Sequence, residues 1–105
     1  MNFRVRLTRE AESDLERLFD FVLERELARN DGDLTVPERA IAALRAGMAT
    51  LKTSPFTCRK AGSSPFLREL VISFGHSGYV ALFEVEDAAT VTVLAVRHQL
   101  EDDFH

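Results

Sequence analysis

The stretch RELVISFGHSGYVALFEV, residues 68–85, decides the fold, because it has the composition of a β-hairpin. Residues common in strands fill both of its halves, and the turn-forming GHSG at 75–78 separates them. We therefore expect strands at Phe66–Phe74 and Tyr79–Val85. A third β-rich run, Thr90–His98, follows the short polar segment EDAA, so the sequence predicts an antiparallel meander of three strands.

The N-terminal half predicts one more strand and two helices. Phe3–Leu7, FRVRL, alternates apolar and basic residues, as a strand with one buried face does. Thr8 then suits the N-cap of a helix that runs to about Ala28, before the turn residues NDGD. Thr35–Glu38 has the pattern of a capping box and predicts a second helix, which ends before Pro55. Apolar residues recur at helical spacing in both segments: Ala11, Leu15, Leu18 and Val22 in the first, and Ile41, Leu44, Met48 and Leu51 in the second.

These elements together indicate an α+β fold. The loop between the two helices is short, so we expect the helices to pack as an antiparallel hairpin. Residues 54–65 are rich in Ser, Pro, Thr, Gly and basic side chains and are predicted to form a loop. The order β-α-α-β-β-β predicts a helical hairpin packed on one face of a mostly antiparallel sheet, and we expect residues 1–105 to form one such domain.

The predicted sheet carries apolar side chains on both of its faces. In Phe66–Phe74, strict alternation places one set of apolar residues on one face, Leu70, Ile72 and Phe74, and a second set on the other, Leu67 and Val71. In Thr90–His98 the two sets are Val91, Val93 and Ala95 on one face and Leu94 and Val96 on the other. Two helices cover only one face of such a sheet. Either a partner protein covers part of the other face, or the curled sheet and the loop at 54–65 cover it within the chain.

Composition limits the classes of function. The formal net charge is −4 and the pI about 5.3, so no overall positive field attracts nucleic acid, and a nucleic-acid binder has to concentrate its arginines locally. The single cysteine, Cys58, has no partner for an internal disulfide, which favours a reducing compartment. No signal peptide and no membrane-spanning run is recognisable. We expect a cytoplasmic protein without a membrane segment or cofactor.

Neither a metal site nor a nucleophilic site is predicted. The acidic and histidine side chains near the C-terminus have no recognised ligand spacing and no second shell to orient them, so a solvated end is expected there. The serines lie outside any G-x-S-x-G pattern, and Gly62 in KAGSSPF matches no phosphate-binding loop. The residues considered as metal ligands are His98, Glu101, Asp102, Asp103 and His105.

Basic residues on the sheet side of the chain are the remaining candidates: Arg59, Lys60, Arg68, Arg97 and His98. Alternation along the last strand sends Arg97 and His98 to opposite faces, which argues against a catalytic pair. Arg68 and Arg97 lie close together if their strands are neighbours. Such a basic cluster can hold a phosphodiester or bind the acidic residues of a protein partner.

The ordered set of motifs resembles the toxins of the RelE/ParE superfamily, which belong to bacterial type II toxin–antitoxin systems. The resemblance covers nearly the whole chain and rests on LTREAESDLERLFDF at 7–21, RELVISFGHSGYVALFEV at 68–85 and VTVLAVRHQLEDDF at 91–104. It implies a toxin neutralised by a cognate antitoxin, whose C-terminal segment wraps the toxin and whose N-terminal part is of the ribbon-helix-helix type. Such an antitoxin covers apolar surface by helix-in-groove contacts or by adding a strand to the sheet.

The superfamily divides by target. The resemblance implies either a RelE-like toxin, which cleaves mRNA in the ribosomal A site with basic side chains and often a C-terminal tyrosine, or a ParE-like toxin, which poisons DNA gyrase. Here the aromatic residue of the tail is Phe104, which has no hydroxyl to transfer a proton, and the only tyrosine, Tyr79, lies at a hairpin start. These departures favour the ParE-like branch. A degenerate toxin that only binds its antitoxin is a third alternative.

Each target implies its own contact residues. For a gyrase poison that acts without catalysis, we expect the end of the last strand and the tail to contact gyrase. The candidate residues are Arg68, Arg97, His98 and Phe104. For a ribosome-dependent mRNA endonuclease, Lys60, Arg68 and Arg97 are the candidates that stabilise a pentavalent phosphate.

Overall fold

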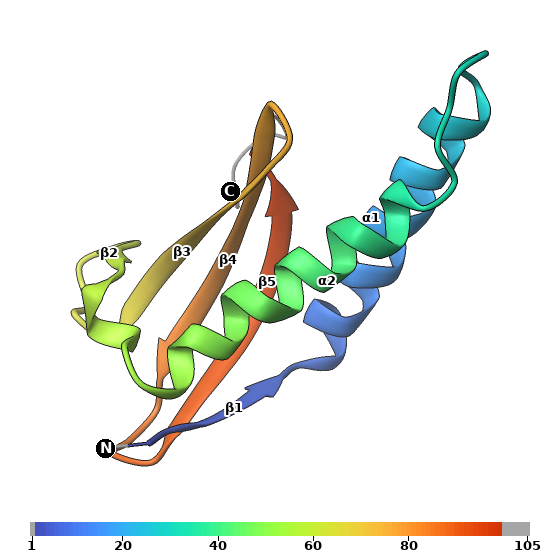
Figure 1. Cartoon of the computed structure of the whole chain (residues 1–105). Helices are drawn as coiled ribbons and strands as arrows, with labels where there is room; N and C mark the ends of the chain where they lie inside the picture. The colour runs from blue at the N-terminus through green and yellow to red at the C-terminus, as the bar shows by residue number, and fades with distance from the viewer. Residues whose placement is uncertain (1, 100–105) are drawn as a thin grey trace.

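Two helices pack on one face of a five-stranded sheet in the computed structural model, which describes residues 2–99 (Figure 1). The strand order is β1-β5-β4-β3-β2, with β1 parallel to β5 and the other pairs antiparallel. The predicted α+β fold is therefore confirmed. The elements are β1 (Arg4–Leu7), α1 (Arg9–Leu27), α2 (Val36–Ala49), the 3-10 helices η1 (Thr50–Lys52) and η2 (Pro55–Thr57), β2 (Arg59–Lys60), β3 (Leu67–Phe74), β4 (Ser77–Val85) and β5 (Thr90–His98).

The two helices begin in different ways. Thr8 is the N-cap of α1, as predicted, and its hydroxyl accepts a hydrogen bond from the backbone N–H of Ala11 at 3.0 Å. At α2 the predicted capping box is wrong, because Thr35 has helical backbone angles and its side chain makes no capping bond. Instead Asp33 accepts hydrogen bonds from the hydroxyl and backbone N–H of Thr35, at 2.7 and 2.9 Å. These bonds hold the pKa of Asp33 below its ordinary value.

The segment predicted as a loop contains more structure than the sequence indicated. Within residues 54–65, Pro55–Thr57 forms η2 and Arg59–Lys60 adds the edge strand β2, while η1 lies just before this segment. This strand pairs with Arg68 and Glu69 of β3, and the carboxylate of Glu69 accepts a hydrogen bond from Arg59 at 2.9 Å. A two-residue strand carries too little periodicity to be recognised in sequence.

A β-bulge in β5 overturns the predicted arrangement of its side chains. The pairs on either side of the irregularity are Leu82 with Ala95 and Phe83 with Val93. Leu94 is therefore an extra residue, which shifts the alternation of β5 by one position. Val96, which was predicted to oppose Val91 and Val93, is fully buried in the core together with them.

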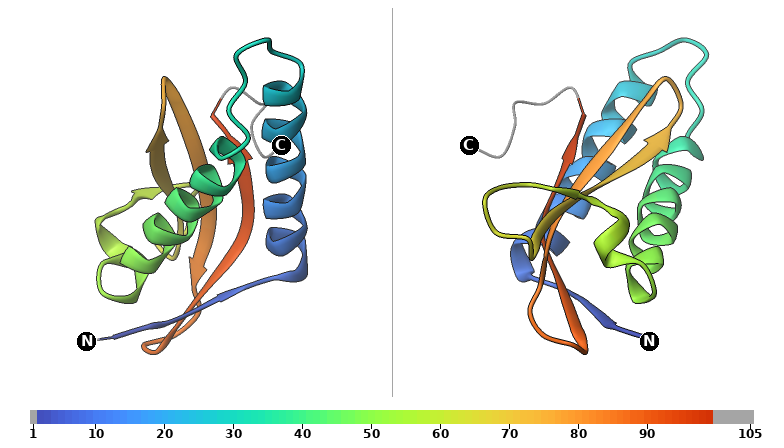
Figure 2. Two further views of the ribbon diagram at one scale, coloured as in Figure 1. Left: turned by 45° about the vertical axis from the view of Figure 1, so that its right-hand side comes forward. Right: turned by 90° about the vertical axis from the view of Figure 1, so that its left-hand side faces the viewer.

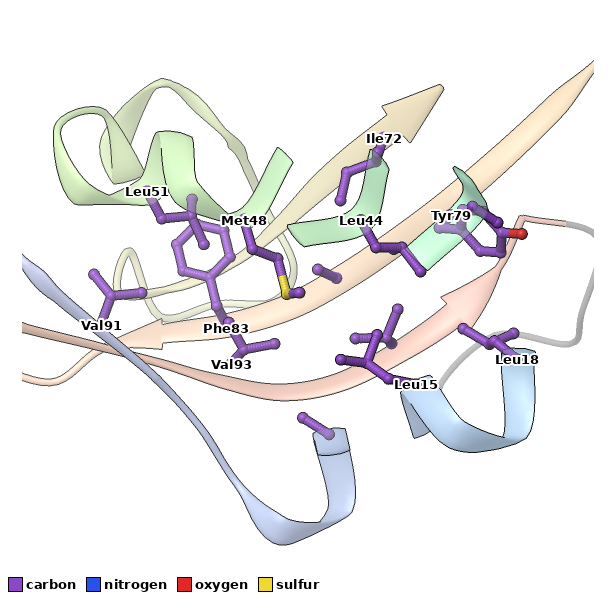
Figure 3. Packing of buried hydrophobic residues seen from close by; sticks show 14 of the residues in the cluster. Leu15, Leu18, Leu44, Met48, Leu51, Ile72, Tyr79, Phe83, Val91 and Val93 are labelled. Carbon is purple, nitrogen blue, oxygen red and sulfur yellow. The ribbon is translucent and has the colours of Figure 1, made fainter. Parts of the chain in front are cut away.

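The core lies between the helices and this face of the sheet (Figure 3). Phe83 and Leu44 are fully buried in this core, which also contains Met48 from α2 and Leu15 from α1. On the opposite face of the sheet, Val71 is 40% exposed. Neither helix among residues 2–99 is both long enough and apolar enough to cross a membrane.

Candidate functional site

The end of β5 has an edge that side chains of α1 cover. β1 pairs only with Thr90–Val93, so the following residues of β5 have no strand beside them on that side. There the hydroxyl of Thr8 donates to the carbonyl of Leu94 at 3.2 Å, and the backbone N–H of Val96 donates to Asp14 Oδ2 at 2.9 Å. Arg17 donates to the carbonyl of Val96 at 3.5 Å. This edge is therefore closed to a partner strand.

Arg97 is tied to the same edge. Its Nη1 lies 2.7 Å from Asp14 Oδ2 and also donates to the carbonyl of Val96 at 3.0 Å. The Arg97 side chain is 32% exposed and that of Asp14 only 14%, so this ion pair is partly shielded from solvent. Sequence reasoning missed Asp14. The available signal was an acid at an inward-facing position of α1, one residue before the buried Leu15.

His98 points to the other side of the strand and contacts different groups. Its Nε2 lies 2.9 Å from Ser77 Oγ, and its ring packs edge-on against Tyr79 with 5.4 Å between the ring centroids. His98 and Tyr79 are directly paired across β4 and β5, so they share the face that the helices cover. Tyr79 is only 3% exposed, and burial raises its pKa.

Arg68 holds the segment between α2 and β3. Its guanidinium donates to the carbonyls of Pro65, Phe56 and Cys58 at 2.8, 3.1 and 2.7 Å. It also lies over the Phe56 ring, 5.1 Å from the centroid. Most of its donors are thus used within the chain, which makes it first of all a structural residue. The neighbouring Cys58 is partly buried, and this burial raises the pKa of its thiol.

The basic candidates of the sheet do not converge on one point. Lys60 is paired with Arg68 across β2 and β3. Arg97 lies two strands from Arg68, about 10 Å across the sheet. It is also displaced along the strands, because Arg68 pairs with Phe83 and Arg97 with Val80.

The proposed tail residues lie outside the part of the chain that the structure describes. Phe104 is one of them, and so are Glu101, Asp102, Asp103 and His105, which were considered as metal ligands. Within residues 2–99, no group of three or more His, Cys, Asp or Glu side chains is placed to hold a metal ion.

A groove of about 440 Å³ is lined by residues of α1 and α2. Phe19 and Ile41 are among its apolar lining residues. Three acids of α1, Glu12, Glu16 and Asp20, line it as well, and so does Arg45 of α2, which lies 3.8 Å from Glu12. Ile41 was predicted to lie in the apolar stripe of the second helix, and in the structure both Phe19 and Ile41 are only half-buried. The groove is therefore apolar, with a charged border in which three acids face one arginine.

Comparison with known proteins agrees with this fold. A family model described as ParE toxin of type II toxin-antitoxin system, parDE, matches residues 5–103. A solved structure described as a chromosomal ParDE TA system from P. aeruginosa contains a chain with a similar fold, with a TM-score of 0.70 and 15% sequence identity. The match covers 91% of this chain and 95% of that one. No protein with a curated function matches the sequence significantly.

Proposed function

The chain belongs to the ParE toxin family of type II toxin–antitoxin systems, and from this we propose that it poisons DNA gyrase by stabilising the cleaved-DNA complex. The observation that carries the proposal is the family match, which extends over residues 5–103. A toxin of such a system has a cognate antitoxin as its partner. The proposed action needs binding to gyrase and no chemical step by the toxin.

The alternative is a ribosome-dependent mRNA endonuclease. It needs basic side chains that meet at one phosphate and a group that transfers a proton. The separation of Arg68 from Arg97 across the sheet argues against these two as one phosphate clamp. Tyr79 is buried beneath the helices, with its pKa raised, and is poorly suited to accept a proton from an RNA hydroxyl.

A paired assay separates the two targets. Purified toxin is added to gyrase in a DNA supercoiling reaction and, in parallel, to a translating extract in which mRNA cleavage is followed. We expect loss of supercoiling and accumulation of cleaved DNA, with intact mRNA, and addition of the cognate antitoxin restores supercoiling. Cleavage of ribosome-bound mRNA without any effect on gyrase would show that the alternative is correct.

For the contact with gyrase we propose the end of β5 and the tail, with Arg97, His98 and Phe104 as the contacting residues and Arg68 in support. Among these, Arg97 is the informative position, because its guanidinium is partly exposed while it is held by Asp14. In the same assay, Arg97→Ala is compared with Arg97→Lys, which keeps a positive charge near Asp14. A loss of gyrase poisoning in the first variant, with a folded protein, supports the contact.

For the antitoxin we propose the groove between α1 and α2 as a docking site. Its apolar floor suits the apolar face of a helix. Its three acids outnumber its one arginine, Arg45, and so favour lysine or arginine at the border of that helix. The occupant is thus a basic amphipathic helix in the toxin-wrapping segment of the antitoxin, which we expect to be of the ribbon-helix-helix type.

Charge reversal in the groove tests this docking site. Glu16→Lys combined with Asp20→Lys places two positive charges against the basic helix, and we expect the affinity for the cognate antitoxin to fall by at least about tenfold, as like-charge contacts at an interface do. The matched control is Glu24→Lys, an exposed acid of the same helix that does not line the groove. Calorimetric titration gives both affinities. Equal affinity for the double variant and the wild type would place the antitoxin elsewhere.

A further inference from the structure

A second hollow, of about 490 Å³, is lined by residues of both helices and of the β3–β4 turn. The α1–α2 loop and the β3–β4 turn lie at the same end of the molecule (Figure 2). The position of the hollow between helices and sheet brings together residues that are far apart in sequence. The polar side chains that line the hollow include Arg25 of α1, Arg29 of the α1–α2 loop, Arg39 of α2, and Ser77, Tyr79 and His98 of the sheet.

The lining of this hollow is positively charged, although the whole chain has a net charge of −4. Among residues 2–99, the only acid that lines it is Glu26, against three arginines. Glu26 is 4% exposed, and its carboxylate accepts hydrogen bonds from the backbone N–H of Asp33 at 3.0 Å and from Arg29 at 3.3 Å. This acid is thus used to hold the loop between the helices.

The arginines are ordered but remain available to a ligand. Arg39 lies 3.3 Å from Asp33, and Arg29 lies 3.5 Å from Asp31 in addition to its bond to the buried Glu26; the side chains of Asp33 and Asp31 are 53% and 83% exposed. Ion pairs this exposed contribute little, so a more highly charged anion can replace the carboxylates of Asp31 and Asp33. The side chain of Arg25 is 51% exposed, and its Nε lies 4.0 Å from the nearest carboxylate oxygen, that of Glu26.

The sheet supplies neutral donors on the opposite wall. The ring of Tyr79 is fixed between Phe74, at 6.3 Å between centroids, and His98, at 5.4 Å. Its hydroxyl makes no hydrogen bond to any of residues 2–99, and burial raises its pKa, so it stays protonated as a donor at neutral pH. Ser77 lies beside it, in contact with His98 at 2.9 Å.

From this arrangement we propose that the hollow binds the phosphate group of a nucleotide-sized ligand, either a free nucleotide or the terminal nucleotide of a DNA strand. Guanidinium groups, a hydroxyl donor and the available volume are what a phosphorylated ligand of this size requires. The inference goes beyond gyrase poisoning, because it concerns the isolated toxin and does not depend on which target the toxin has.

Titration of the full-length toxin tests this pocket. Adenosine 5′-monophosphate is compared with adenosine by following backbone amide signals in NMR spectra. We expect the nucleotide to shift the signals of residues 75–79, adenosine to have no effect at the same concentration, and pyrophosphate to compete with the nucleotide. A DNA oligonucleotide with a 5′-phosphate is then compared with the same oligonucleotide without the phosphate and with the mononucleotide. If the phosphorylated oligonucleotide binds most tightly, the ligand is the end of a DNA strand and not a free nucleotide. Equal shifts with adenosine and the nucleotide overturn the proposal.

Variants then locate the binding. Arg25→Gln and Arg39→Gln are each expected to weaken nucleotide binding by about tenfold, the effect of losing one charge-assisted contact. Tyr79→Phe keeps the ring packing and should weaken binding to a smaller extent. Arg59→Gln, which changes an arginine that is 60% exposed and lies on β2, is the control and leaves the affinity unchanged. An equal loss in the Arg59 variant would indicate nonspecific attraction and contradict the pocket.

Discussion

Val96→Glu is expected to destabilise the protein by about 3–5 kcal/mol, the usual result of leaving an unpaired charge in a core. Val96 is fully buried against the helices, and its neighbours in the core are apolar. The matched variant Ala95→Glu changes the preceding residue, which is half-buried on the other face of β5. We expect Ala95→Glu to lower the free energy of unfolding by less than about 1 kcal/mol, as substitutions at partly exposed positions usually do.

Chemical denaturation of both variants measures the two free energies of unfolding. The comparison tests the bulge at Leu94, because strict alternation along β5 places Ala95 in the core with Val93 and turns Val96 outward. If Ala95→Glu is the more destabilising change, β5 has a regular ladder and the bulge is wrong. A circular dichroism spectrum of each variant without denaturant establishes that the starting state is folded.

The elements that the sequence predicted well are those whose signals are local. Thr8 is recognisable as an N-cap because its partner is three residues away, and Thr90–His98 is recognisable as a strand from its own composition. The bulge in that strand is different, because it depends on how β5 pairs with β4. Nothing within LAVRH shows that Leu94 is the extra residue.

The candidate sites depend even more on contacts between distant residues. Asp14 meets Val96 across 82 positions of the chain, and the arginines of the helices face His98 only because the hairpin folds over the sheet. Sequence reasoning therefore looked for basic clusters along the strands, where Arg68 and Arg97 are in fact separated. It also overlooked Arg25 and the pocket to which it belongs, since each helical arginine alone is typical of a solvated surface.

Asp14→Ala is expected to lower the free energy of unfolding by about 2–3 kcal/mol, because two donors lose their shared acceptor. The backbone N–H of Val96 and the guanidinium of Arg97 both bind Asp14 Oδ2, at 2.9 and 2.7 Å. Asp14 is 14% exposed, so water replaces it poorly. For a domain of this size the loss corresponds to a decrease in Tm of roughly 10–20 °C. Asp20→Ala, which removes an exposed acid from the same helix, is the control and should leave Tm unchanged.

Two further variants separate the roles of the Asp14 carboxylate. Asp14→Asn keeps an acceptor for the N–H of Val96 but removes the charge that pairs with Arg97, so we expect an intermediate loss. Arg97→Ala leaves the hydrogen bond from the N–H of Val96 to Asp14 in place. We therefore expect it to lower the free energy of unfolding by less than Asp14→Ala does. A double-mutant cycle between Asp14 and Arg97 then gives their coupling energy, which for residues in direct contact is about 0.5–3 kcal/mol. If Asp14→Ala is as stable as the wild type, α1 is not needed to close the edge of β5, and that edge is open to a partner strand.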